Sequence, residues 1–167
     1  LEYLYVFKKM KYPNLLEEKR LWKKEFKTVI GLDEVGRGPL AGPVVAGAVS
    51  ITNHKFTLKD FKRLKDSKKL SLKQRKRFYE IIIKHPDFKW GIGIVSEKTI
   101  DKINILEATK LAMLKAVKNL QNKLKRTRSI IPQKPTIVEK MDKIDFLILD
   151  GNFKLNLTIP QKSIIKG

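Results

Sequence analysis

The stretch VIGLDEVGRGPLAGPVVAGAVSI, residues 29–51, decides the fold and poses the main question about this chain. Two apolar runs, residues 28–33 at its start and residues 43–51 at its end, are typical of short buried strands because β-branched residues are frequent in both. The connection between them is rich in glycine and favours a tight return. Asp33 and Glu34 end the first run, although the formal net charge of the chain is +20. The question is what stabilises two carboxylates at the end of a buried strand.

The composition bounds the class of protein. With 167 residues, 42% of them hydrophobic, the chain is long enough for one domain with a buried core. Its 37 Lys and Arg residues against 17 Asp and Glu predict a polyanionic partner, nucleic acid ahead of an anionic membrane surface. A codon bias toward lysine is the alternative reading of this excess.

Several classes of protein are excluded by what the sequence lacks. Without cysteine there is no disulfide framework and no Cys-ligated zinc. No apolar run reaches the roughly 20 residues that span a bilayer, and the first residues show no signal-peptide core. We expect a soluble protein of the cytoplasm without a membrane partner.

A capping box marks the start of one predicted helix. Ser71 stands three residues before Gln74, the spacing at which the two side chains satisfy free N–H groups of the first turn. Pro86 ends this helix. The side chains predicted to form its buried stripe are Leu72, Phe78, Tyr79 and Ile82.

The remaining elements are predicted from hydrophobic periodicity. A short helix follows Asn14, its expected N-cap, and a longer one covers residues 99–124. Residues 88–95 alternate as a strand does, residues 144–150 form a buried strand, and residues 162–167 belong to a last one. The order strand, strand, helix, strand, helix, strand, strand indicates an α/β domain with a mixed sheet.

Two of the predicted strands end in acidic residues. Asp33 and Glu34 end the first, and Asp150 precedes a Gly-Asn turn at the end of a later one. Ligands of α/β sheets gather at the carboxyl ends of strands, and hard divalent ions such as Mg2+ relieve the repulsion between carboxylates there. Two such ions about 4 Å apart can clamp both oxygens of a phosphodiester displacement. In a basic chain, this pattern predicts metal-dependent cutting or joining of nucleic acid.

Structural alternatives exist for the same residues. Asp33 and Asp150 could simply start turns, as Asp often does. Arg37 could pair with the adjacent acids in a purely structural salt bridge. The segment GRGPLAG also resembles a dinucleotide-binding fingerprint, but Gly42 comes one residue late and a strand follows. That reading fails as well because Asp33 and Glu34 would face a pyrophosphate with no metal between them.

Five motifs occur in order along the chain. They are EEKRLWKKEFKTVIGLDE (17–34), GLDEVGRGPLAGPVVAGAV (31–49), KDSKKLS (65–71), IDKINILEATKLAM (100–113), and LILDGN (147–152) through IPQKSIIKG (159–167). Together they resemble the motifs of the type 2 ribonucleases H, the ribonuclease HII family. The likeness covers about residues 17–167, with residues 121–143 outside it.

This resemblance implies a ribonuclease H-like fold, with a five-stranded mixed sheet flanked by helices. It implies an endonuclease that hydrolyses the RNA strand of RNA–DNA hybrids, nicks 5′ to a single ribonucleotide in duplex DNA, and leaves 5′-phosphates. The metal-binding and catalytic acids of the family correspond to Asp33, Glu34 and Asp150, with two Mg2+ or Mn2+ ions expected per site. A monomer is expected.

The resemblance also implies a set of substrate contacts. Gly36, Arg37 and Gly38 correspond to the segment that recognises the ribose 2′-hydroxyl, the group that distinguishes RNA from DNA. Glycines allow backbone groups to approach that hydroxyl closely. Ser67 and Lys68 are expected to contact phosphates, and an ordinary solvated lysine is the alternative for Lys68.

Two departures from the family pattern bear on activity. The family carries a fourth metal-site aspartate directly after the IIKG segment, followed by a serine- and alanine-rich helix and a tyrosine that stacks on the junction. This sequence ends at Gly167, so we expect a single catalytic domain, 1–167, without its C-terminal portion. Residues 121–143 are expected to be a basic loop insertion, either a tolerated one or an added nucleic-acid contact.

Three hypotheses follow. The first is a two-metal ribonuclease. The second is a truncated, catalytically impaired homologue that binds RNA–DNA hybrids or junction duplexes without cutting them. The third, a basic nucleic-acid-binding domain with purely structural acids, predicts no dependence on divalent ions.

Overall fold

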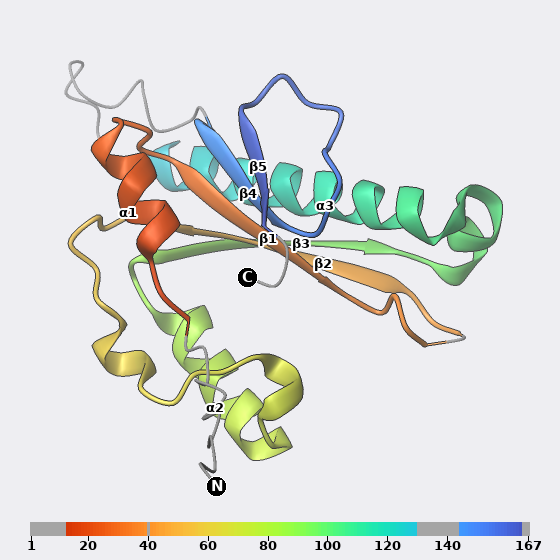
Figure 1. The fold of residues 1–167 in the computed structure, drawn as a ribbon, viewed down its shortest axis with the longest axis horizontal. Helices are drawn as coiled ribbons and strands as arrows, with labels where there is room; N and C mark the ends of the chain where they lie inside the picture. The colour runs from red at the N-terminus through yellow and green to blue at the C-terminus, as the bar shows by residue number, and fades with distance from the viewer. Residues whose placement is uncertain (1–12, 40, 130–143, 165–167) are drawn as a thin grey trace, which may run out of the picture.

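The predicted strands pair into one five-stranded mixed sheet with the order β3-β2-β1-β4-β5, as the sequence indicated (Figure 1). The computed structural model describes residues 13–39, 41–129 and 144–164, without the side chains of residues 60 and 126–129. The strands are β1 (Val29–Val35), β2 (Val44–Ile51), β3 (Phe88–Val95), β4 (Phe146–Asp150) and β5 (Gln161–Ile164). The helices are α1 (Leu16–Lys23), α2 (Leu72–Lys84) and α3 (Glu97–Ser129), with short 3-10 turns η1 (Leu58–Phe61) and η2 (Ser67–Lys69).

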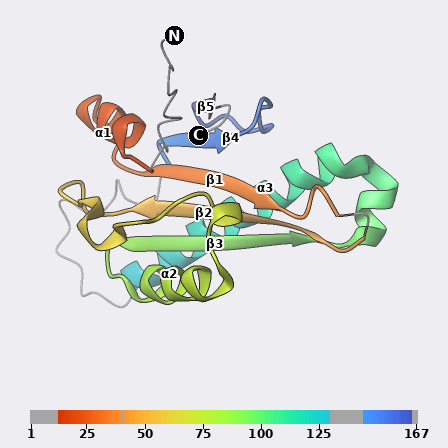
Figure 2. The same cartoon turned by 60° about the horizontal axis from the view of Figure 1, so that its bottom comes forward.

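The directions of the strands follow from the lengths of their connections. The glycine-rich return joins β1 and β2 as an antiparallel pair, and β3 continues antiparallel to β2 (Figure 2). The chain then crosses over through α3, so β4 pairs with β1 in parallel, and β5 pairs with β4 in parallel. The carboxyl ends of β1, β4 and β5 therefore lie at one edge of the sheet.

One face of the sheet is covered by α3 and is called the α3 face here. Its core contains side chains that alternate along the strands, among them Ile30 and Leu32 of β1 and Leu147 and Leu149 of β4. On β3 the same face presents Gly91 and Gly93, and a Cβ at either would collide with the backbone of α3. The glycines thus allow the helix to lie directly on the strand.

Among the described residues, the opposite face, called the α2 face, is covered at one end only. There α1 packs through Leu21 on Val29 and Ile148. Beside it, Phe78 of α2 joins a cluster with Phe56, Phe61 and Leu70 that packs on Ile51 and Phe88. Toward the other end of this face several apolar strand side chains remain exposed in the described part of the chain. They include Val35, Val49, Ile92 and Ile94.

The capping box of α2 is confirmed, but half of its predicted buried stripe is wrong. Ser71 and Gln74 make both reciprocal hydrogen bonds. Leu72 and Tyr79, however, are 75% and 59% exposed. The helix stands off from the sheet and inserts Phe78 as its only buried side chain, so the other apolar positions have no surface to pack on (Figure 1).

The other predicted helices exist with changed boundaries. α3 runs on to Ser129, so the predicted loop is wrong for residues 121–129, and residues 130–143 lie outside the described residues. The extension is rich in Lys, Gln and Arg, which are good helix formers. The N-cap of α1 is Leu15 rather than Asn14, although the Asn14 Oδ1 accepts a hydrogen bond from the Leu16 N–H at 3.0 Å.

A kink interrupts α3 at Asn104, where a continuous helix was predicted. Its backbone has φ 66° and ψ 165°, outside the helical region. The Asn104 Oδ1 accepts hydrogen bonds from the N–H groups of Leu106 and Glu107, as an N-cap does. The spacing Asn-x-x-Glu in NILE is a capping-box signal that could have revealed this second start.

No helix in the described part of the chain is long and apolar enough to cross a membrane.

Candidate active site

Asp33 and Asp150 lie side by side at the carboxyl ends of two parallel strands. Leu32 of β1 pairs with Leu149 of β4, so the two aspartates occupy the next position along each strand. Because Leu32 and Leu149 point into the α3 core, both aspartates point to the α2 face. This face is uncovered at their position, and both residues are exposed. The topology thus brings together two of the acids predicted from the sequence.

The electrostatics of Asp33 reflect this crowding. Desolvation raises the pKa of the Asp33 carboxyl above its ordinary value even though part of the residue is exposed, and the Glu34 N–H opposes the shift by donating to Asp33 Oδ1 at 2.7 Å. The negative charges of Asp150 and Glu34 raise the pKa further, while the positive charge of Lys68 lowers it. Repulsion between neighbouring carboxylates is the condition that a bound cation relieves.

Glu34 points to the opposite face from Asp33, because neighbouring residues on a strand alternate. Its Oε1 accepts a hydrogen bond from Arg37 Nη1 at 3.1 Å, in an ion pair where the Glu34 side chain is only 14% exposed. Its Oε2 is buried and has no hydrogen-bond partner in the described part of the structure. An unpaired buried acceptor costs about 1–3 kcal/mol, so this oxygen is available for a further donor or a cation.

The acidic side chains at this site are of the type that binds a hard divalent ion, but too few of them lie close together. Asp33 and Asp150 offer carboxylate oxygens on one face, the ligand type that Mg2+ and Mn2+ take. Among the described residues, no group of three acidic, histidine or cysteine side chains is close enough to hold a metal ion. The reason is that Glu34 is turned toward Arg37 on the other face.

The glycine turn after β1 has a specific steric requirement at its first position. Gly36 has φ +100°, and a Cβ there would collide with the Pro43 carbonyl oxygen and lie 3.2 Å from Val44 Cα. Gly38 has open space around it. Arg37, between them, is 41% exposed and held by Glu34. The turn therefore keeps the guanidinium of Arg37 and the backbone of Gly38 accessible beside the acids.

Replacing Gly36 by Ala is expected to lower the free energy of unfolding by about 2 kcal/mol or more. The new Cβ would meet backbone atoms, which cannot rotate away, at a φ that costs an L-residue of order 1 kcal/mol or more. Gly38→Ala is the matched control and is expected to change the value by less than about 1 kcal/mol. Urea unfolding of both variants is the measurement, and equal losses would contradict the steric argument.

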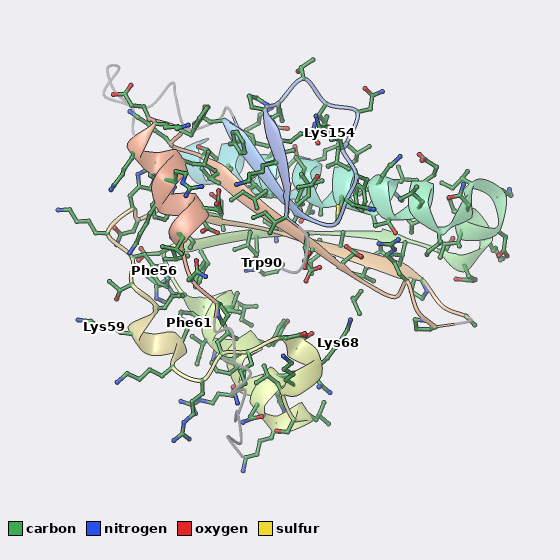
Figure 3. All side chains as sticks on the ribbon, in the orientation of Figure 1. Phe56, Lys59, Phe61, Lys68, Trp90 and Lys154 are labelled. Carbon is green, nitrogen blue, oxygen red and sulfur yellow. The ribbon has the colours of Figure 1, made fainter. Side chains whose placement is uncertain are left out.

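Lys68 is brought near the acids by a braced turn. The side chain of Asp66 accepts a hydrogen bond from the Lys68 N–H at 3.0 Å. Arg75 Nη1 donates to the carbonyl oxygens of Ser67 and Leu70 at 3.2 and 2.6 Å. Lys68 projects from this turn toward the sheet (Figure 3), and its charge acts on Asp33. Ser67 lies exposed on the same turn.

Sequence reasoning missed the residues that hold this turn in place. Asp66 gave a usable signal, since Asp commonly caps a following turn through its side chain. Arg75 gave none, because its partners are backbone carbonyls several residues earlier in the chain. Both are bracing residues of the turn that carries Lys68.

Comparison with known proteins now identifies the family. The family model described as ribonuclease HII matches residues 30–146, most of the chain. The chain belongs to the ribonuclease HII family. It is 45% identical over 150 residues to the ribonuclease HII of Chlamydia caviae, covering 90% of this chain and 59% of that protein. For Chlamydia trachomatis serovar A the identity is 42% over 158 residues, covering 92% and 61%. The chain thus spans about three fifths of the length of these relatives.

Solved structures support the fold. A mutant of Bst-RNase HIII matches with a TM-score of 0.51 and 21% identity, covering 77% of this chain and 38% of that one. The ribonuclease H2 of Pyrococcus horikoshii OT3 matches with a TM-score of 0.50 and 23% identity, covering 83% and 63%. The ribonuclease H-like α/β fold implied by the motifs is therefore confirmed.

Proposed function

We propose that residues 1–167 form a single catalytic domain that hydrolyses the RNA strand of RNA–DNA hybrids and nicks 5′ to single ribonucleotides in duplex DNA. One observation carries the proposal. Asp33 and Asp150, from strands distant in sequence, meet on an uncovered face directly before the Gly36–Gly38 turn. Membership of the ribonuclease HII family supports the same reaction.

Asp33 and Asp150 would hold divalent ions, Mg2+ or Mn2+, and two per site are expected. When bound, such ions supply a water of lowered pKa and positive charge at the leaving 3′-oxygen. The two carboxylates supply oxygen ligands from one face, and their repulsion disfavours the metal-free state. We assign Glu34, whose Oε2 is buried without a partner among the described residues, to the same centre, and this requires its side chain to turn away from Arg37 when the ions bind.

Recognition of the ribonucleotide is assigned to the turn after β1. Backbone groups of Gly36 and Gly38 can approach a 2′-hydroxyl closely because no side chain intervenes. Arg37 offers further donors of its guanidinium, since only one is used by Glu34 in the described structure. In this proposal the RNA-specific contact would lie beside the carboxylates assigned to the chemistry.

Binding of phosphates next to the site is assigned to Ser67 and Lys68. Lys68 acts on Asp33 electrostatically, so its ammonium group lies within reach of an anion held at the acids. The hydroxyl of Ser67, exposed on the same turn, can donate to the same or a neighbouring phosphate.

The test is cleavage of duplex DNA carrying one internal ribonucleotide, with Mg2+, with Mn2+ and with EDTA. Nicking 5′ to the ribonucleotide is expected with either metal and not with EDTA. The ribonuclease HII of Chlamydia caviae, run in parallel, controls the substrate. If this chain cuts with neither metal but still binds the duplex, the alternative of a hybrid-binding homologue without catalysis replaces the proposal.

A further inference from the structure

One segment of the chain is especially rich in positive charge. Residues 54–84, called the basic module here, contain twelve Lys and Arg and three Asp and Glu, a net charge of +9 out of +20 for the whole chain. Residues 97–125, a stretch of similar length in α3, contain seven Lys and Arg and three Asp and Glu. Residues 115–143 carry nine Lys and Arg and two Asp and Glu, so the charge is uneven along the chain and is high in both this segment and the basic module.

Most cations of the basic module are exposed, and they are not paired with acids in the described part of the protein. No Lys or Arg of the module forms an ion pair with a described residue. Arg75 has a structural role, because its guanidinium donates hydrogen bonds to backbone carbonyl oxygens of the η2 turn. The remaining cations of α2 are free to meet an anion, and all of them are exposed. They are Lys73, Lys76, Arg77 and Lys84.

These four cations share one side of α2. Their spacing, three, four and eleven residues from Lys73, places them on the side away from Phe78, which anchors the helix. From Lys73 to Lys84 the helix advances by roughly 16 Å. A duplex strand carries one phosphate per roughly 3.4 Å of axis, so this side can meet several consecutive phosphates.

The basic module lies on the same face of the sheet as Asp33 and Asp150. Its aromatic cluster packs on Ile51 and Phe88, which point to the α2 face. Lys68, in the turn that precedes α2, projects toward the sheet (Figure 3), and its charge acts on Asp33. Because α2 begins at Leu72, a phosphate held by Lys68 lies close in sequence to the first cation of the helix, Lys73.

We propose that the outer side of α2, through Lys73, Lys76 and Arg77, binds phosphates of the nucleic-acid duplex beyond the cleavage site. The inference rests on the proposed function, because it takes the substrate duplex as the ligand. An anionic membrane fits less well, since a helix lying in a bilayer interface requires a continuous apolar side. The described part of α2 exposes only Leu72 and Tyr79 as large apolar residues.

The experiment measures binding without catalysis. A fluorescently labelled RNA–DNA hybrid is titrated with the protein in EDTA at several KCl concentrations, and the slope of log K against log salt counts the phosphate contacts. For Lys73→Gln/Lys76→Gln/Arg77→Gln, the magnitude of this negative slope is expected to decrease by about 2–3. With equal affinities at 1 M salt, this corresponds to a loss of affinity of about 100- to 1,000-fold near 100 mM salt. The matched control, Lys98→Gln/Lys102→Gln/Lys118→Gln on exposed positions of α3, loses the same charge and should change the slope by less than about 1.

Three outcomes would overturn the proposal. An unchanged slope in the α2 variant would show that its cations touch no phosphate. Equal losses in both variants would show that net charge, not this surface, drives binding. If the α2 variant no longer binds vesicles with 30% phosphatidylserine but still binds the hybrid normally, the surface binds membranes instead. Circular dichroism confirms that the variants fold, and the EDTA condition separates this result from any failure to cleave.

Discussion

Asp33→Asn is expected to lower the rate of cleavage at an embedded ribonucleotide by more than about 100-fold. The substitution keeps the shape of the side chain but removes one of the two carboxylates that meet on the uncovered face. Changes to groups that merely support metal ligands typically cost 10- to 100-fold in metal affinity or activity, so loss of a proposed ligand should cost more. Single-turnover cleavage at saturating Mg2+ is the measurement.

The same variant should bind the uncut duplex in EDTA at least as tightly as the unmodified protein. In the absence of metal, the Asp33 carboxylate repels the phosphates, and its neutralisation removes that repulsion. Binding therefore separates a catalytic defect from a folding defect. Asp101→Asn, an exposed acid of α3, is the control and should leave both cleavage and binding unchanged. Cleavage by Asp33→Asn at the normal rate would remove this residue from the proposed metal centre.

The parts of the fold that depend on local chemistry were predictable from the sequence. The β-branched runs around the glycine turn predicted the β1–β2 hairpin, and the pair Ser71 and Gln74 predicted the start of α2. Periodicity did not predict which apolar residues of α2 are buried. Apolar residues at helical spacing show that one side of a helix can be buried. Whether Leu72 and Tyr79 are in fact buried depends on how far α2 stands from the sheet.

The candidate site was predictable in its composition but not in its arrangement. Acids at strand ends pointed to Asp33 and Asp150, yet their proximity depends on the parallel register of two strands far apart in sequence. No local pattern encodes that register. The separation of Glu34 from both follows from the two-residue period of a strand. Applied to the adjacent acids Asp33 and Glu34, that period predicts that their side chains point to opposite faces of the sheet.

Gly93→Ala is expected to destabilise the protein by about 3 kcal/mol or more. A Cβ at Gly93 would collide with the Ala112 carbonyl oxygen and lie 2.6 Å from the Ala116 nitrogen and 2.7 Å from Lys115 Cβ. Two of these three atoms are backbone atoms of α3, so relief requires moving the helix off the strand. Overpacking a core usually costs 1–3 kcal/mol, and the absence of a side chain that can rotate away places this site at or above the upper end.

The matched control is Gly47→Ala, on the neighbouring strand but on the α2 face, where a Cβ meets nothing within 4 Å. It should change the free energy of unfolding by less than about 1 kcal/mol, because the new methyl group meets no neighbour and alanine restricts the unfolded chain. Urea unfolding of both variants decides the matter. If Gly93→Ala were as stable as Gly47→Ala, the direct seating of α3 on β3 would be refuted. In the structure, the packing of α3 on β3 stabilises the neighbouring strands β2 and β1, and β1 carries Asp33. Without this packing, other contacts in the core would have to hold these strands in place.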